Sequence, residues 1–244
     1  MCWSAEVSVA MVGVGVTATA VTYLRAERPA IWLTLAYFTV MEALQVWGYA
    51  VVDQCGTPSN QTVTVLSDLH IVLQPFLINA FAMEMVPHSV MRRARVWVYA
   101  ACALSAGVML LQIAPLTGVG PCLPGSPLCG EQWCTVSGTW HIGWQVPYNG
   151  LMTNVENQLG LASGFPTYMI TAFALPLVYG AWRFVLLHAV TGPVLAWMLT
   201  DNPNEMPAVW CLFSIAILLI ALSPLVRRSV ETETWWGRSV QSAT

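Results

Sequence analysis

Residues 62–88 read TVTVLSDLHIVLQPFLINAFAMEMVPH, and this stretch decides the fold. It is apolar enough to lie in a lipid bilayer, yet it carries the polar side chains Asp68, His70, Gln74, Asn79 and Glu84. An aspartate or arginine at the centre of a membrane helix costs roughly 2.5–3.5 kcal/mol. We therefore expect this helix to be buried among other helices and to border something polar.

The composition of the whole chain is typical of a protein that crosses a membrane several times. Of its 244 residues, 57% are hydrophobic and 9% are charged, whereas soluble domains carry about 25% charged residues. All nine basic residues are arginine, and the lack of lysine excludes a retinal Schiff base and other lysine-based covalent chemistry. The net charge of −3, without a basic stripe, argues against a nucleic-acid partner.

Apolar periodicity predicts an all-α fold, a polytopic membrane protein with seven transmembrane helices in one domain, residues 1–226. A bilayer is crossed by about 20 residues of helix. The expected spans are residues 5–24, 31–52, 62–88, 96–115, 165–181, 184–200 and 208–226. The turn before residue 184 is very short, and one continuous helix is the alternative there. Residues 227–244 are expected to form a polar cytoplasmic tail.

The arginine residues predict the orientation of these spans. All nine fall in the connections after the first, third and fifth spans or in the tail. Positive residues favour the cytoplasmic side, so we expect the N-terminus outside and the C-terminus in the cytoplasm. No basic residue precedes Arg25, so a signal peptide is not expected.

Residues 116–164 form the longest segment predicted to lie outside the bilayer. Trp140, Trp144 and Tyr148 alternate there with polar residues, and such aromatic side chains favour the membrane interface. We expect this segment to be a lid on the outer surface, with a short interfacial helix. The cysteines expected on this side, where disulfides persist, are Cys55, Cys122, Cys129 and Cys134. Their pairing stays open, and their spacing fits no zinc motif.

The polar side chains within the spans define the candidate site. At 100° per residue, His70, Gln74 and Glu84 share one helix face, and Asp68 and Asn79 fall on the opposite face. The full set for a cavity is Glu42, Gln45, Asp68, His70, Gln74, Asn79, Glu84 and His188. These groups either pair with one another to hold the bundle together or line a cavity for a ligand, ion or proton. We favour the cavity, with Glu42 as the buried partner of a proton or cation, and with Asp68 and His70 at an outer entrance.

A metal- or haem-dependent redox enzyme or hydrolase in the membrane is the alternative function. His70 and His188 are possible axial ligands of a haem, but we expect them at different depths. A zinc hydrolase needs three protein ligands, and neither HxxxH nor HExxH occurs. Cys2 and His141, both expected outside, suit copper(I). No cofactor is assigned, and no nucleotide-binding or G-x-S-x-G motif is present.

The N-terminal part resembles a known group of proteins. Met-Cys-Trp-Ser at residues 1–4, a helix of small residues, and then Tyr37, Phe38, Met41 and Glu42 are similar to an uncharacterised family of bacterial multi-span proteins that begin Met-Cys-Trp-Ser or Met-Cys-Phe-Ser. The resemblance covers mainly residues 1–50. It implies a bacterial origin, and with it a place in the inner (cytoplasmic) membrane, but no mechanism. It also draws attention to Cys2 as a ligand, a redox group or a packing residue.

These observations predict a membrane protein with a polar cavity that binds or passes a small ligand or ion. No internal repeat is visible in the sequence, although many secondary transporters have one. A sensor-like protein or an accessory subunit therefore fits better than a transporter. The expected partners are the bilayer and a small molecule or ion, and an oligomer or larger membrane complex is compatible with the sequence.

Overall fold

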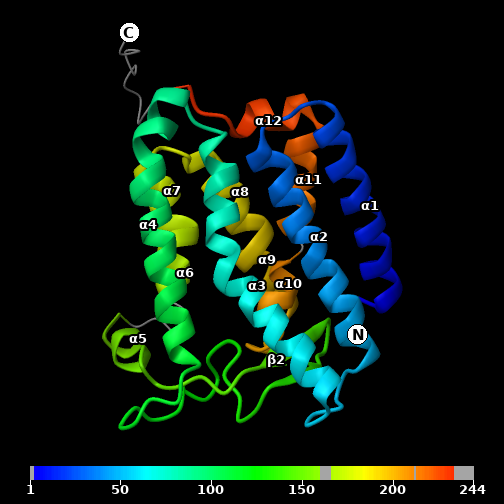
Figure 1. The fold of residues 1–244 in the computed structure, drawn as a ribbon, viewed down its shortest axis with the longest axis vertical. Coiled ribbons are helices and arrows are strands. Elements are labelled where there is room, and N and C mark those ends of the chain that lie inside the picture. The colour runs from blue at the N-terminus through cyan, green and yellow to red at the C-terminus, as the bar shows by residue number, and fades with distance from the viewer. Residues whose placement is uncertain (1–2, 160–165, 212, 234–244) are drawn as a thin grey trace.

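The computed structural model describes residues 3–159, 166–211 and 213–233. The chain is mostly helical, and its longer helices run side by side between two ends (Figure 1). The first half forms α1 (Ala5–Leu24), α2 (Pro29–Ala50), α3 (Pro58–Met83) and α4 (His88–Gln112). The second half forms α5 (Thr153–Leu159), α6 (Pro166–Met169), η1 (Ile170–Ala174), α7 (Leu175–Val178), α8 (Trp182–Ala189), η2 (Val190–Val194), α9 (Leu195–Leu199), α10 (Met206–Trp210), α11 (Phe213–Leu222) and α12 (Pro224–Val230).

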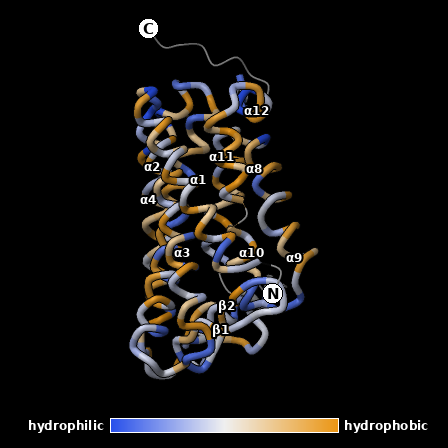
Figure 2. The backbone as a smooth tube through the Cα atoms, turned by 90° about the vertical axis from the view of Figure 1, so that its right-hand side faces the viewer, coloured by the Kyte–Doolittle hydropathy of each residue, from blue (hydrophilic) through white to orange (hydrophobic). Residues whose placement is uncertain are grey.

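Five helices in the described parts of the chain are long and apolar enough to cross a membrane, which indicates a membrane protein. They are α1, α2, α3, α4 and the continuous helix Trp182–Leu199. A sixth results if Met206–Leu222 and Pro224–Val230, which are bent by 108°, form one span. Pro166–Val178 is apolar but shorter. Figure 2 shows apolar residues along the helices and hydrophilic ones recurring at both ends.

Several predicted helix boundaries were wrong, and the caps explain why. The third helix begins at Pro58 rather than residue 62, because Thr57 accepts a hydrogen bond from the Asn60 amide and proline is favourable in the first turn. It ends at Met83, before residue 88. The fourth helix begins at His88, directly after Pro87, rather than at residue 96. The arginines expected in this connection therefore lie in the first turns of α4.

Two helices of the second half contain a π-helical turn. These turns are η1 and η2, and each lies within an otherwise α-helical segment. Pro193 lies inside η2, and Pro176 follows η1 within the first turn of α7. Proline lacks an amide donor and its ring crowds the preceding turn, so it favours such a widened turn. The turn between α7 and α8 contains Gly180 at φ +95°, which favours glycine.

The lid contains a small antiparallel sheet that the all-α expectation missed. Strands β1 (Cys134–Ser137) and β2 (Ile142–Gln145) pair with Cys134 opposite Gln145. Asn60 of α3 binds the β1 backbone at both polar groups of Thr135, donating to its oxygen over 2.9 Å and accepting from its nitrogen over 3.0 Å. A four-residue strand is too short to show a clear alternation of apolar and polar residues, so these strands were not predicted. The backbone groups at the free edge of β1 are bonded by Asn60 of α3.

The prediction that the four outer cysteines form disulfides is confirmed. Cys55 pairs with Cys134, and Cys122 pairs with Cys129. The first bond joins the α2–α3 connection to β1, and the second closes a short loop within the lid. Cys102 and Cys211 are buried free cysteines.

The connections of the chain meet at two opposite ends (Figure 1). At the lid end, backbone hydrogen bonds join Trp3 to Trp140, Asp53 to Thr135, and Trp144 to Asn204. At the other end, α12 follows α11 at a sharp bend, and Thr232 donates its amide to the Met85 oxygen over 2.8 Å. The Thr232 hydroxyl also donates to the Gly180 oxygen. Each end is therefore closed by segments that are distant in sequence.

Candidate functional site

Polar side chains of α3 meet tyrosines from other parts of the chain. Tyr148 of the lid donates its hydroxyl to Asp68 Oδ1, and Tyr168 of α6 donates to Gln74 Oε1. Burial raises the pKa of Tyr148 well above its usual value, so this phenol stays protonated and remains a donor. Asp68 Oδ2 is buried and has no hydrogen-bond partner among the described residues. The lid thus satisfies one of the two Asp68 oxygens.

Asn79 of α3 has hydrogen-bond partners at both the oxygen and the nitrogen of its side chain. Its Oδ1 accepts from the Tyr179 hydroxyl over 3.0 Å. Its Nδ2 donates to the Pro75 oxygen over 2.9 Å and to the Thr171 oxygen over 2.8 Å. Thr171 belongs to η1, where the widened turn exposes backbone carbonyls. Asn79 therefore holds α3 against the α6–α7 segment, which is a structural role.

His70 is bound to α2 through Tyr37. Their rings stack with centroids 3.8 Å apart, and the Tyr37 hydroxyl donates to the His70 backbone oxygen over 2.5 Å. His70 Nε2 lies 2.8 Å from the Tyr37 backbone oxygen. A carbonyl only accepts, so Nε2 carries the hydrogen. The other ring nitrogen, Nδ1, is then a bare acceptor, and it has no partner within the described chain.

His188 lies in an aromatic cluster rather than beside His70. Its Nε2 accepts from the Trp210 indole over 3.1 Å. Its ring stacks on Phe213 at a centroid distance of 3.9 Å. Phe38 and Phe213 lie between the two histidines, with centroid distances of 6.4 Å from His70 to Phe38 and 6.1 Å from Phe38 to Phe213. The structure therefore does not bring the two predicted haem ligands together.

Glu42 and Gln45 form a separate polar group on α2. Their exposed fractions are 3% and 1%. Glu42 Oε2 and both amide atoms of Gln45 lack hydrogen-bond partners among the residues described. Ser8 of α1 and Ser214 of α11 lie beside the Glu42 carboxyl group. Glu42 thus faces the space between α1, α2 and α11.

A narrow pocket borders Glu42 in that space. Its volume is about 10 Å³, and Thr39 and Ser214 also line it. This is about the volume that one water-sized sphere occupies. Close packing explains the size, because a Cβ atom at Gly15 of α1 would overlap the Thr39 side chain. The pocket has room for a water molecule or a small ion.

Glu205 is a buried carboxylate that the sequence analysis did not include in the site. It is 0% exposed and precedes α10. Its oxygens accept hydrogen bonds from the backbone amides of Thr139, Trp140 and His141 and from the Thr200 hydroxyl. Glu205 therefore anchors the β1–β2 turn of the lid to the α9–α10 connection. An acidic residue in a turn gives no sequence signal for this role.

His141, a predicted copper candidate, is buried within the lid, directly before β2. Its ring stacks with Trp3 at a centroid distance of 5.8 Å, and its Nδ1 accepts the Ile142 amide hydrogen over 2.7 Å. Burial lowers its pKa to about 3, so the ring is neutral. Cys2 lies outside the described residues. Within the described ranges, no three His, Cys, Asp or Glu residues are close enough to hold a metal ion.

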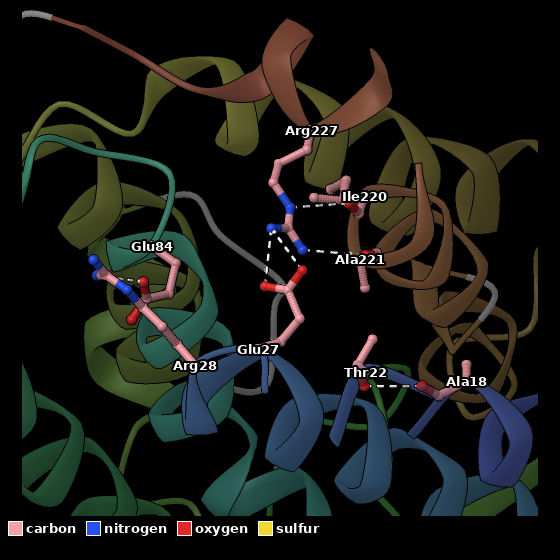
Figure 3. Close-up of polar contacts among 8 residues, drawn as sticks. All are labelled: Ala18, Thr22, Glu27, Arg28, Glu84, Ile220, Ala221 and Arg227. Atoms are coloured by element: carbon pink, nitrogen blue, oxygen red, sulfur yellow. Dashed lines mark hydrogen bonds and ion pairs between the residues drawn. The ribbon is translucent and has the colours of Figure 1, made fainter. Parts of the chain in front are cut away.

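Glu84 lies apart from the other candidates, at the α12 end (Figure 3). It follows the last helical residue of α3 and pairs with Arg28 at 2.8 Å. Beside this pair, Arg227 contacts Glu27 at 3.0 Å. Arg227 also donates to the Ala221 oxygen over 3.1 Å. These ion pairs border a charged pocket of about 230 Å³. The Arg227–Glu27 pair ties α12 to the α1–α2 connection, and the Arg28–Glu84 pair ties this connection to the end of α3.

Comparison with known proteins identifies one family that the chain matches. No curated protein and no solved structure matches the chain. Residues 6–231 match the model of a family of unknown function, DUF5765. This confirms the predicted relation to an uncharacterised family, and it extends the relation from the N-terminal residues to nearly the whole sequence. The chain belongs to the family of unknown function DUF5765.

Proposed function

We propose that this chain is a seven-span protein of the bacterial inner membrane, with the N-terminus outside, in which Glu42 binds a proton or a small cation. The seven-span arrangement counts Pro166–Val178 and Met206–Leu222 as spans beside the five longer helices. The lid and its disulfides then lie outside. The eight arginines of the described ranges precede α2, lie in the first turns of α4 and α8, or lie in α12. They are therefore at the end opposite the lid, which supports a cytoplasmic position for the α12 end.

The observation that carries the proposal is a buried carboxyl group without a cationic partner. Glu42 is 3% exposed on a helix that is apolar enough to span a membrane. The ion pairs between described side chains join Arg28 to Glu84 and Arg227 to Glu27, and neither involves Glu42. A buried carboxylate without compensation is unfavourable by several kcal/mol. Glu42 therefore holds a proton or a bound cation in the folded protein.

The neighbours of Glu42 suit such an occupant. Gln45, one turn along α2, offers an amide oxygen that no described residue binds. The Ser214 hydroxyl lines the same pocket as Glu42. Carboxylate, amide and hydroxyl oxygens are the ligands that hard cations prefer, and the same oxygens also accept a proton or order a water molecule. The pocket volume of about 10 Å³ restricts the occupant to a proton, a water molecule or a monatomic ion.

Thermal unfolding of the full chain in detergent tests this proposal. The unfolding midpoint is measured across a pH series in choline buffer, and then with lithium, sodium or potassium replacing choline. An occupant that binds only the folded state raises the midpoint. We expect one of the metal cations, or a change of pH, to shift the midpoint of the wild type more than that of Glu42→Gln, which keeps only the pH response of other groups such as His141.

A matched control separates this site from general effects of charge. Glu131 is exposed in the lid, and Glu131→Gln removes the same charge from the surface. It should respond to pH and cations as the wild type does. An unchanged response in Glu42→Gln would contradict the assignment of Glu42.

A further inference from the structure

A third pocket, separate from the pocket at Glu42 and from the charged pocket at the α12 end, lies between α3, the lid and the helices that contain the π-turns. Its volume is about 190 Å³. The walls are mostly apolar and come from Pro127 of the lid, Met169, Pro193, Ala196 and Trp210. No residue lines both this pocket and the pocket at Glu42. The two pockets are therefore separate sites.

One polar group in this pocket lacks a partner. Gln74 lines the wall and is 7% exposed. Its Oε1 accepts from the Tyr168 hydroxyl, which leaves Nε2 as a donor. Nε2 donates to none of the described residues. Gln74 lines the pocket, and a donor there without a protein acceptor is best satisfied by a molecule that presents an acceptor oxygen to it.

The other polar group of the wall is already occupied. The Trp210 indole nitrogen donates to His188 Nε2 over 3.1 Å. The Trp210 and Tyr168 rings contact each other edge to face, with centroids 5.7 Å apart and planes at 89°. The indole also packs closely against the backbone of residue 192, which is possible because this residue is glycine and a Cβ atom there would overlap the indole. The Trp210 and Tyr168 rings thus form rigid walls that suit an aromatic ring.

The size of the pocket limits the ligand to about one ring. A cavity of about 150 Å³ with apolar walls binds benzene, so a volume of about 190 Å³ has room for one aromatic ring with a small substituent. A carbonyl substituent supplies the acceptor that Gln74 Nε2 lacks. A charged ligand is disfavoured, because none of the residues that line the pocket carries a formal charge.

The surroundings indicate how the ligand arrives. Ile170, Val194 and Trp197 are neighbours in sequence of the wall residues, and they are 55%, 45% and 71% exposed. They belong to apolar helical segments, where exposed apolar surface contacts lipid. A ligand that dissolves in the bilayer reaches the pocket along this surface.

We propose that this pocket binds a lipophilic molecule with a single aromatic ring and a carbonyl oxygen, which accepts a hydrogen bond from Gln74 Nε2. The inference does not depend on the occupant of Glu42. Binding places the ring against the walls formed by Tyr168 and Trp210, and it places the oxygen at Gln74. Residues of α6, η2 and the lid all line the site, so occupancy stabilises their arrangement.

Photolabelling of the full chain in lipid nanodiscs tests the proposal. The probe is 4-azidoacetophenone, and the sites of labelling are mapped by mass spectrometry of peptides. The competitors are acetophenone and α-methylstyrene, which have nearly the same shape but differ in the carbonyl oxygen. We expect labels on the peptides of α6, η2 and α10, and we expect acetophenone to compete about tenfold better, the factor of one hydrogen bond.

Two variants make the result specific to this pocket. Gln74→Leu removes the donor, so labelling should persist while the two competitors become equal. Ala196→Phe fills the pocket from a wall that does not touch the Tyr168–Gln74 hydrogen bond, so labelling should fall to background. Labelling elsewhere, or equal competition in the wild type, would overturn the proposal, and so would unchanged labelling of Ala196→Phe.

Discussion

Glu205 and Glu42 are both buried carboxyl groups, but their surroundings differ. Glu205 is 0% exposed and accepts hydrogen bonds from three backbone amides and a hydroxyl. Glu42 is 3% exposed, and one of its oxygens has no partner in the described chain. The comparison teaches that burial alone does not indicate function. A carboxylate whose hydrogen bonds are complete is a structural anchor, whereas an uncompensated one requires an occupant.

Glu205→Gln should have the largest effect on stability. The amide group replaces one acceptor oxygen with a donor, which faces the amides of the β1–β2 turn. Breaking a buried charged network typically costs about 3–5 kcal/mol. We expect a free energy of unfolding lower by an amount in that range, measured by denaturant titration in detergent. Glu131→Gln, on the exposed part of the lid, is the control, and equal stability of the two variants would contradict an anchoring role for Glu205.

Tyr148→Phe should have an intermediate effect. Asp68 has one oxygen bonded to Tyr148 and one without a partner, so it stands between Glu205 and Glu42. Loss of a hydrogen bond to a charged or buried carboxyl group costs about 1.5–3 kcal/mol. We expect a loss of that size in the free energy of unfolding. Tyr23→Phe serves as the control, because Tyr23 is 62% exposed, and it should leave stability unchanged.

The neutral ring of His141 should make the lid sensitive to acid. Its pKa is lowered by burial from 6.5 to about 3, so the unfolded chain binds a proton below pH 6.5 that the folded chain does not. Stability therefore falls with decreasing pH across that window, by about 1.4 kcal/mol per pH unit. His141→Asn keeps an acceptor for the Ile142 amide and does not titrate. Its stability should fall less steeply between about pH 6 and pH 4, and an equal slope would contradict this account.

Glu42→Gln should leave overall stability nearly unchanged. Glutamine has the shape of a protonated glutamate, and no described cationic side chain loses a partner. We expect a change within about 1 kcal/mol at neutral pH. Glu42→Gln and Glu205→Gln replace the same group in the same way, so any difference in their stability reports the surroundings of the two carboxyl groups. A loss as large as that of Glu205→Gln would show that Glu42 is a structural anchor too.

The exposed ion pair of Arg28 and Glu84 should contribute least. The side chain of Arg28 is 57% exposed, and such pairs contribute about 0–1 kcal/mol. A double-mutant cycle of Arg28→Gln and Glu84→Gln should give a coupling energy within this range, and added salt should reduce it. A coupling energy as large as that of a buried pair would contradict the view that burial separates these sites.

The sequence predicted the position of the polar residues well and their partners poorly. The spacing of Asp68, His70, Gln74 and Asn79 correctly indicated a helix with polar neighbours on more than one side. Tyr148, which bonds Asp68, lies 80 residues away along the chain, and no local pattern signals such a contact. Glu205 was missed for the same reason, because its donors are backbone amides of the lid.

For the cysteines too, the sequence predicted where they lie but not which of them pair. Their position on the lid side followed from the order of the apolar segments, and all four form disulfides. Which cysteines pair depends on the fold of the lid, where β1 carries Cys134 to the α2–α3 connection. The two short strands of that fold gave no periodic signal. Helix ends were likewise misplaced wherever caps, rather than hydropathy, set them.

Infrared difference spectroscopy of the protein in lipid nanodiscs tests the role of Glu42 most directly. Spectra are recorded in choline buffer at acidic and alkaline pH, and again after addition of the cation that gives the largest thermal shift. We predict a carbonyl band of a protonated carboxyl group that disappears with alkali or with the cation. The band should be absent from Glu42→Gln and present in Glu131→Gln. Identical carbonyl bands in the wild type and Glu42→Gln would contradict the proposal that Glu42 holds the proton or cation.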